Sequence, residues 1–330
     1  MSVSQTADSA PLIVVLTTGG TIASSTDSDG VVRNDTSRGA PQLPEHLATQ
    51  LPEGLRIDAR EVLSKDSSQM TDDDRLLVCR AIAAALENPE VTAVVVTHGT
   101  DSLADMAMAA DLYHRDPRPV IITGAQRPAD DPAPDGPANL FDAYQVALSE
   151  PARGLGALVV FGRAIMQARG VAKWHTSDEL GFARNAPEDD EDAPERPLTL
   201  PLPAEGTSWP RVECVWAGSG ASATALTSLI DDGIAGYVLV AMGMGNLPSK
   251  VAEVAKEHAN TPCVLTSSVP RGAVNPVYGG PGGGAELLDA GAIAGGWLRA
   301  GQARVALAAL LADDPAATPE TLAPRFAALL

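Results

Sequence analysis

An apolar strand that ends in a polar turn and passes at once into a helix is the feature that most constrains this chain. Val94-Val95-Val96 has the β-branched composition of a buried parallel strand. The polar run Thr97–Asp101 follows it, and an amphipathic segment then extends from Leu103 to Leu112. Open α/β sheets bind ligands at the carboxyl ends of their strands, where helix N-termini favour anions. The pattern predicts a parallel α/β fold, although the polar run also fits an ordinary capped turn.

Two other predicted strands end in the same way. The strand Leu12–Leu16 is followed by a turn with two glycines and Thr21, and the strand Val120–Thr123 by the turn Gly124–Arg127. The carboxyl ends of neighbouring parallel strands lie at one edge of a sheet. We therefore expect these three turns to converge on one site.

The alternation of strands and helices is interrupted once. In residues 185–210 the acidic run Glu188–Asp192 is followed by five prolines, which is typical of an exposed linker. The sequence therefore predicts an N-terminal domain at 1–184, a linker at 185–210 and a smaller C-terminal α/β domain at 211–330. Strand–helix alternation favours a mostly parallel sheet in each domain.

The sequence also makes three local structural predictions. Thr71 is expected to cap a helix that buries leucines and isoleucine along one face: Leu76, Leu77, Ile82 and Leu86. Residues 165–174 are expected to form a hairpin that turns at Arg169-Gly170. The polar segment Ser24–Ala40 reads as a long loop of the kind that closes over a site.

Charge and cysteine content narrow the class of function. The 23 basic and 42 acidic residues give a net charge of −19, which disfavours binding to nucleic acid or an anionic membrane. The three cysteines are scattered, so we expect buried structural thiols in a reducing compartment and no metal site. The first ten residues lack the pattern of an export signal, and we expect a cytoplasmic protein.

Seven motifs, in order, resemble those of the bacterial-type L-asparaginase family, and in particular the cytoplasmic, type I-like asparaginase/glutaminase members. They are Thr18–Ala23, Asp66-Ser67-Ser68, His98–Asp101, Gly124–Pro128, Asp135–Leu140, Gly170–Lys173 and Gly243–Asn246. The resemblance implies an α/β protein of two domains, each with a mostly parallel sheet flanked by helices, and a larger, flavodoxin-like N-terminal domain. It also implies an amidohydrolase that converts L-asparagine to L-aspartate and ammonia in asparagine catabolism, with weaker hydrolysis of glutamine.

The resemblance assigns roles to individual residues. It implies Thr21 as the nucleophile, with Thr100, Asp101 and Lys173 as a second catalytic group joined by hydrogen bonds. The residues implied in substrate binding are Gly20, Ser67, Ser68, Ala125 and Asn246. Neither a metal nor an organic cofactor is implied. Water would resolve a covalent acyl-enzyme or attack directly, and both routes remain open at this point.

The chain departs from many periplasmic members of the family in its lid loop. Those members carry a tyrosine after the nucleophile, whereas residues 22–40 contain none. In the family, homodimers or homotetramers form, and the C-terminal domain of one subunit completes the site of another. Tyr278 and Glu286 lie in the corresponding region and are candidates to act across such an interface. His98 has no proton-transfer role in the family, and we expect it to be structural.

Two other functions are compatible with this set of motifs. One is the related amidotransferase subunit that supplies ammonia for tRNA-linked glutamate. That subunit usually carries an extra N-terminal domain, which we do not expect here because the first strand begins by residue 12. An acidic surface also suits tRNA poorly. The other is an amino-acid sensor without activity. The presence of Thr21, Thr100, Asp101 and Lys173 together argues against a sensor.

Overall fold

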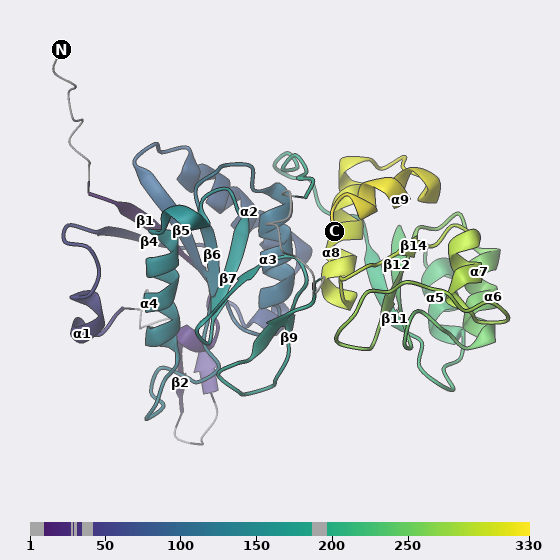
Figure 1. Cartoon of the computed structure of the whole chain (residues 1–330), viewed down its shortest axis with the longest axis horizontal. Coiled ribbons are helices and arrows are strands. Elements are labelled where there is room, and N and C mark those ends of the chain that lie inside the picture. The colour runs from purple at the N-terminus through teal and green to yellow at the C-terminus, as the bar shows by residue number, and fades with distance from the viewer. Residues whose placement is uncertain (1–9, 28, 30–31, 35–41, 187–196) are drawn as a thin grey trace, which may run out of the picture.

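The chain folds into two α/β domains that lie side by side (Figure 1). The structure is a computed structural model that describes residues 10–27, 29, 32–34, 42–186 and 197–330. The predicted fold class is confirmed, because each domain contains a parallel sheet with helices packed against it.

The N-terminal sheet has six strands in the order β4-β1-β5-β6-β7-β8. All neighbouring pairs are parallel except β7 and β8. Taken in chain order, the parallel strands follow the 2-1-3-4-5 arrangement of flavodoxin-like sheets. The strands are β1 (Leu12–Thr17), β4 (Arg56–Glu61), β5 (Val91–Thr97), β6 (Val120–Thr123), β7 (Ala157–Phe161) and β8 (Ala164–Gln167).

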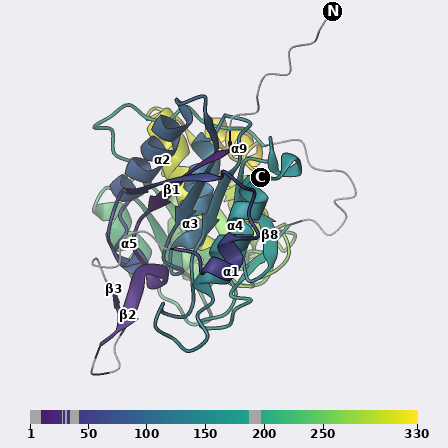
Figure 2. The ribbon, with the colours of Figure 1, turned by 90° about the vertical axis from the view of Figure 1, so that its left-hand side faces the viewer.

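Alternate strand residues face the two sides of this sheet, and helices cover both sides (Figure 2). Val14 and Val94 pack with α2 (Asp72–Leu86) and α3 (Leu103–Tyr113), whereas Ile13 and Val95 pack with α4 (Gly136–Ala147). Burial on both faces explains the nearly continuous apolar runs in β1 and β5. The shorter elements of this domain are η1 (Thr21–Ala23), β2 (Ser24–Thr26), β3 (Val32–Asn34), α1 (Glu45–Ala48), η2 (Ser67–Gln69), η3 (Glu150–Ala152), β9 (Val171–Lys173) and β10 (Phe182–Arg184).

The C-terminal sheet is parallel throughout, in the order β11-β12-β13-β14. Its strands are β11 (Val212–Trp216), β12 (Gly236–Ala241), β13 (Cys263–Ser267) and β14 (Ile293–Ala294). One face packs against α5 (Thr224–Asp231), α6 (Ser249–Glu257) and α7 (Gly284–Asp289). The chain ends in α8 (Ala300–Asp313) and α9 (Pro319–Ala327).

Helix α8 is shared by the two domains. It packs on α3 of the N-terminal domain and on β11, β12 and β13 of its own domain, so it lies at the junction seen in Figure 1. Its residues from Gln302 to Leu311 are buried except Arg304, which is partly exposed. One hydrophobic cluster therefore continues from the N-terminal sheet through α3 and α8 to Val212, Val238 and Val264.

The predicted helix after Thr71 is confirmed, apart from one residue of its buried face. Thr71 and Asp74 form a reciprocal capping box, in which the Thr71 side chain accepts from the backbone N–H of Asp74. Leu76, Ile82 and Leu86 are buried as expected, but Leu77 is 43 % exposed. Neighbouring helix positions differ by about 100°, so Leu76 and Leu77 cannot both face the core.

The predicted hairpin over residues 165–174 is wrong. β8 pairs with β7, and β9 pairs with β10, so the two arms of the expected hairpin pair with different strands. The turn at Arg169-Gly170 therefore carries the chain from the edge of the main sheet to a separate two-stranded ribbon. Similarly, part of the expected loop Ser24–Ala40 forms a ribbon of β2 and β3, and residues 28, 30, 31 and 35–40 lie outside the described part.

The segment predicted as an exposed linker is partly packed. Residues 187–196 lie outside the described part of the chain. Beyond them, Leu200 and Trp209 are buried against the N-terminal domain, and the indole of Trp209 donates a hydrogen bond to the Tyr113 hydroxyl at 2.9 Å. The apolar residues Leu200 and Trp209 therefore pack on the N-terminal domain, although the composition of the segment predicted an exposed linker.

The cysteine prediction holds for two of the three residues. Cys79 and Cys263 are buried free thiols, whereas Cys214 is exposed. Cys214 is on β11, which lies at an edge of the C-terminal sheet. Within the described residues, no helix is both long and apolar enough to cross a membrane.

Candidate active site

Three loops from the N-terminal domain meet at two glycines. Gly20 follows β1 with φ at +88°, and a Cβ at this residue would lie 2.4 Å from the Gly99 Cα, which is in the loop after β5. A Cβ at Gly99 would lie 2.6 Å from the Ser67 Oγ, in the loop after β4. Real Cβ atoms do not approach other atoms so closely, so both positions require glycine. The loops of Thr21, Ser67 and Thr100 are thereby held together.

Thr21 begins η1, directly after Gly20, and is partly buried. The backbone around it is fixed, because Ser24 Oγ donates to the Gly20 carbonyl at 2.9 Å and the buried Ile22 packs at Gly136 of α4. The Thr21 hydroxyl itself has no hydrogen-bond partner among the described residues. The loop therefore positions this hydroxyl without engaging it.

Thr100, Asp101 and Lys173 form one hydrogen-bonded group. Lys173 Nζ donates to Thr100 Oγ1 at 2.8 Å and to Asp101 Oδ1 at 2.7 Å. Lys173 is at the end of β9, and the other two residues immediately precede α3. The Thr100 side chain is buried, whereas the Asp101 side chain is 63 % exposed and therefore available to a ligand. A lysine paired in this way is in reach of both an alcohol and a carboxylate.

Gln126 also belongs to this group, although the sequence did not predict it. The Thr100 hydroxyl donates to Gln126 Oε1 at 3.3 Å, and Gln126 Nε2 donates to the His175 carbonyl at 3.2 Å. Because Lys173 already donates to the same hydroxyl, the Thr100 proton is directed to Gln126 in this structure. Gln126 lies inside the motif Gly124–Pro128, so the sequence indicated that this loop is near the site. The motif did not indicate that the Gln126 side chain contacts Thr100.

His98 is buried and hydrogen-bonded, as expected for a structural residue. It is 1 % exposed; its Nδ1 lies 2.7 Å from Thr18 Oγ1 and its Nε2 lies 3.2 Å from Ser102 Oγ. Burial lowers the pKa of His98 to about 3, so its ring is neutral at pH 7. Ser102 in turn donates to the Ser67 carbonyl at 2.7 Å. His98 thus connects the end of β1 to the loop that carries Ser67.

The buried Ser67 side chain contacts the loop that carries Asp101. Its Oγ accepts from the backbone N–H of Asp101 at 3.1 Å, and none of the described groups accepts its own proton. Ser68 is exposed beside it. Ala125 is buried in the third loop, the loop after β6. On one side of it, Gly124 lies against the His98 carbonyl. On the other side, the backbone N–H groups of Gln126 and Arg127 donate to the Asp135 carboxylate.

Asn246, Tyr278 and Glu286 are in the C-terminal domain, and their described contacts stay within it. Asn246 forms a backbone bridge with Met242, and Tyr278 accepts at its carbonyl from Ala285 N at 3.1 Å. Glu286 pairs with Lys256 at 3.1 Å, and the hydrogen bond from Lys256 lowers the pKa of Glu286. Within one chain, the structure therefore does not join these three residues to the cluster around Lys173.

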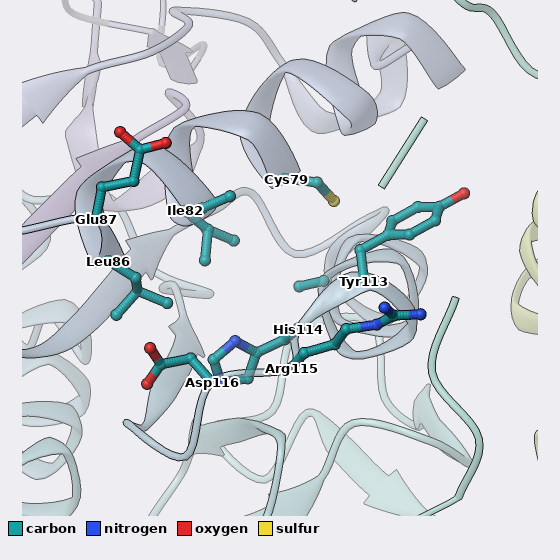
Figure 3. A pocket seen from close by; sticks show the side chains of 10 residues that line it. Cys79, Ile82, Leu86, Glu87, Tyr113, His114, Arg115 and Asp116 are labelled. Atoms are coloured by element: carbon teal, nitrogen blue, oxygen red, sulfur yellow. The ribbon is translucent and has the colours of Figure 1, made fainter. Parts of the chain in front are cut away.

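A separate cavity of about 250 Å³ lies between the C-terminal parts of α2 and α3 (Figure 3). Its wall includes Cys79, Ile82, Tyr113 and His114. None of the candidate site residues lines it. Ser67 lies just before α2, and Thr100 and Asp101 lie just before α3, so the cavity lies toward the opposite ends of these helices. Residues 10–27, 29, 32–34, 42–186 and 197–330 contain no group of three or more His, Cys, Asp or Glu arranged for a metal ion.

Comparison with protein families gives matches in both domains. Residues 12–189 match the family model described as "Asparaginase, N-terminal", and residues 211–322 match "Glutaminase/Asparaginase C-terminal domain". A probable L-asparaginase of Deinococcus radiodurans is 35 % identical, over 92 % of this chain and 94 % of that protein. A probable periplasmic L-asparaginase of Haemophilus influenzae is 30 % identical, over 93 % and 90 %.

A solved structure is also similar. The crystal structure of a probable cytoplasmic L-asparaginase from Campylobacter jejuni superimposes with a TM-score of 0.78. It has 25 % sequence identity, and the match covers 96 % of this chain and 99 % of that one.

Proposed function

The chain belongs to the asparaginase family, and from this premise we propose that it hydrolyses L-asparagine to L-aspartate and ammonia with Thr21 as the nucleophile. The observation that carries the proposal is the group in which Lys173 lies 2.8 Å from Thr100 and 2.7 Å from Asp101. The close contact of Gly20 with Gly99 fixes the loop of Thr21 beside this group. An alcohol, a lysine and a carboxylate together supply the acid–base chemistry that amide hydrolysis needs.

The proposed reaction has two steps. The Thr21 oxygen bonds to the side-chain amide carbon of asparagine, the Thr21 proton passes to the amide nitrogen, and the C–N bond breaks to release ammonia. Water then adds to the resulting ester, one of its protons returns to the Thr21 oxygen, and aspartate leaves. We assign Thr100, with Lys173 and Asp101, to proton transfer in these steps, and the backbone N–H of Thr100 to the developing oxyanion.

The α-groups of the substrate fix its position in this proposal. The Ser67 hydroxyl has a free proton to donate to the α-carboxylate, and the exposed Asp101 carboxylate can pair with the α-ammonium. Ser68, the Gly20 backbone and the Ala125 carbonyl are assigned to the same pocket. Both α-contacts are made by neighbouring loops, so the distance from them to Thr21 is set by the fold.

This arrangement predicts a preference for asparagine over glutamine. Glutamine is longer by one methylene, a difference usually worth about 1–3 kcal/mol or roughly 10–200-fold in kcat/KM. Purified protein should release ammonia from both amides, more efficiently from asparagine. Equal kcat/KM for the two would show that the pocket does not select by length, and no ammonia from asparagine would overturn the proposed function. Succinamate, which lacks the α-ammonium, is the matched control for the contact with Asp101.

We propose that the active enzyme is a homodimer or homotetramer in which the C-terminal domain, with Asn246, completes the site of a neighbouring subunit. Tyr278 is the best-placed residue to orient Thr21 from the partner. It is 57 % exposed, whereas the other three tyrosines are buried. The glycine tract after it is not free to swing as a whole, because Gly284 begins α7 and the Tyr278 carbonyl is bonded to Ala285. The Glu286 carboxylate accepts hydrogen bonds from Lys256 Nζ and from Gly280 N, the latter at 2.7 Å. We therefore propose that Glu286 stabilises the loop after Tyr278 and does not act on a neighbouring site.

Hybrid oligomers test the assignment of Tyr278. Thr21→Ala and Tyr278→Phe subunits should each be nearly inactive alone, because each lacks one half of every site. Random re-assembly of equal amounts should restore about a quarter of the wild-type activity in dimers, since one site in each hybrid is intact. Unmixed samples taken through the same dissociation and re-assembly are the control. Full activity of Tyr278→Phe alone, or no recovery on mixing, would contradict the assignment.

We place the enzyme in the cytoplasm. The buried free thiols of Cys79 and Cys263 suit a reducing compartment, and the similar solved structure is titled cytoplasmic, although the Haemophilus relative is named periplasmic. Fractionation of cells that express the full chain tests this placement.

A further inference from the structure

We propose that Gln302, a buried residue of α8, is a positioning residue for Lys173 and thereby for the Thr100–Asp101 pair. This inference rests on the proposed function of that group. Gln302 is 3 % exposed and belongs to the C-terminal domain of the same chain, so it differs from the residues assigned to a partner subunit. Its carboxamide lies between the two segments that carry the group.

The hydrogen bonds of Gln302 join these segments directly. Nε2 donates to the Ala104 carbonyl at 3.0 Å and to the Ala168 carbonyl at 2.8 Å, and Oε1 accepts from Gly170 N at 2.7 Å. Ala104 is in the first turn of α3, three residues after Asp101, and Gly170 is three residues before Lys173. Both amide protons are used, and the donors and acceptors match in only one orientation of the amide. The carboxamide therefore links the start of α3 to the base of β9.

The turn held by Gln302 has little freedom to move. The Gly170 carbonyl accepts from Asn185 N at 2.9 Å, and a Cβ at Gly170, whose φ is +88°, would lie 2.2 Å from the Asn185 carbonyl oxygen. Arg169, also in the turn, donates to Asp111 of α3 at 2.6 Å and to the Leu329 carbonyl at 2.7 Å. From this turn, β9 runs only from Val171 to Lys173, so a displacement of the turn reaches the lysine with little damping.

Helix α8 is held against the N-terminal domain close to Gln302, so it can keep the Gln302 carboxamide in place. Arg304, two residues after Gln302 on α8, donates to both carboxylate oxygens of Asp72 on α2, at 2.6 and 2.9 Å. Asp72 carries no assigned catalytic role. Arg304 therefore docks the same helix through hydrogen bonds to Asp72 of α2 and to the Val212 carbonyl of β11, none of which reaches the carbonyls or the N–H group that Gln302 contacts, and it provides a matched control.

The test compares Gln302→Met with Arg304→Met in the full chain. Gln302→Met keeps the length of the side chain but removes all three hydrogen bonds. It should lower kcat for asparagine roughly 10–100-fold, in line with the cost of a small misplacement of reacting groups. KM should rise by a smaller factor than kcat falls, because Asp101 is also assigned to the α-ammonium whereas the Ser67 contact with the α-carboxylate is retained. Arg304→Met should lower the thermal midpoint but leave kcat within about twofold of wild type.

A double variant separates positioning from general destabilisation. If Gln302 acts through Lys173, adding Gln302→Met to Lys173→Met should change kcat by less than about twofold, because the interaction is already lost. Should Gln302→Met not fold, Gln302→Asn retains an amide that is too short to span the three partners, and the same loss of kcat is expected.

The outcomes distinguish this inference from the proposed function. A wild-type chain that releases no ammonia from asparagine overturns both. If the wild type is active, then wild-type kcat in folded Gln302 variants, an equal loss in Arg304→Met, or an additive loss in the double variant overturns the role of Gln302 alone.

Discussion

Replacing Thr21 with alanine is expected to lower kcat for asparagine by roughly a hundredfold to ten-thousandfold, because the atom proposed to attack the amide is removed. The thermal midpoint of unfolding should be unchanged. The Thr21 hydroxyl has no partner among the described residues, and its loop is held by Ser24 and by the packing of Ile22 on Gly136. The measurement is the steady-state rate of ammonia release, with the thermal midpoint measured on the same samples.

Thr21→Ser is the matched control for this variant. It keeps the hydroxyl and removes only a methyl group, so it should retain much more activity than alanine. If a folded Thr21→Ala enzyme turns over asparagine at close to the wild-type rate, Thr21 is not the nucleophile.

Thr100→Val should produce a loss of kcat of roughly a hundredfold or more, for a different reason. Valine has nearly the shape of threonine, so the buried site remains filled. The substitution removes the acceptor that lies 2.8 Å from Lys173 Nζ and the donor to Gln126 Oε1. Lys173 then keeps its contact with Asp101 but loses its contact with an alcohol, and proton transfer through Thr100 is no longer available.

The control for Thr100→Val lies three residues earlier in the same segment. Thr97 is also a buried threonine, but its hydroxyl has no hydrogen-bond partner in the described structure. Thr97→Val should therefore leave kcat unchanged and raise the thermal midpoint slightly, since an unsatisfied buried hydroxyl is replaced by a methyl group. A Thr100→Val enzyme as active as Thr97→Val would remove Thr100 from the mechanism.

The parts of the fold that could be predicted from sequence are those governed by local patterns. β-branched runs identified β5 and β6, the capping box at Thr71 identified the start of α2, and glycine in the loops after β1 and β5 marked the edge of the sheet where the loops meet. Each of these signals lies within a few residues of the element that it specifies.

The errors arose where partners distant in sequence decide the structure. The hairpin at residues 165–174 failed because β9 has its pairing partner at residues 182–184, and a two-residue period cannot show which strand is the partner. Leu200 and Trp209 dock on the N-terminal domain in a segment whose composition resembles a linker. Gln302 carried no signal at all, because a glutamine in an alanine-rich helix is ordinary until its three backbone partners are known.

The position of α8 at the junction has a consequence for biosynthesis. α3 leaves the ribosome early, but the helix that covers one of its faces begins only at residue 300. At typical rates of synthesis, the 186 residues between Tyr113 and Ala300 (114–299) take roughly 10–40 s to translate. During that time the nascent N-terminal domain exposes apolar side chains of α3 that later join the shared core, a surface on which chaperones act and through which nascent chains aggregate.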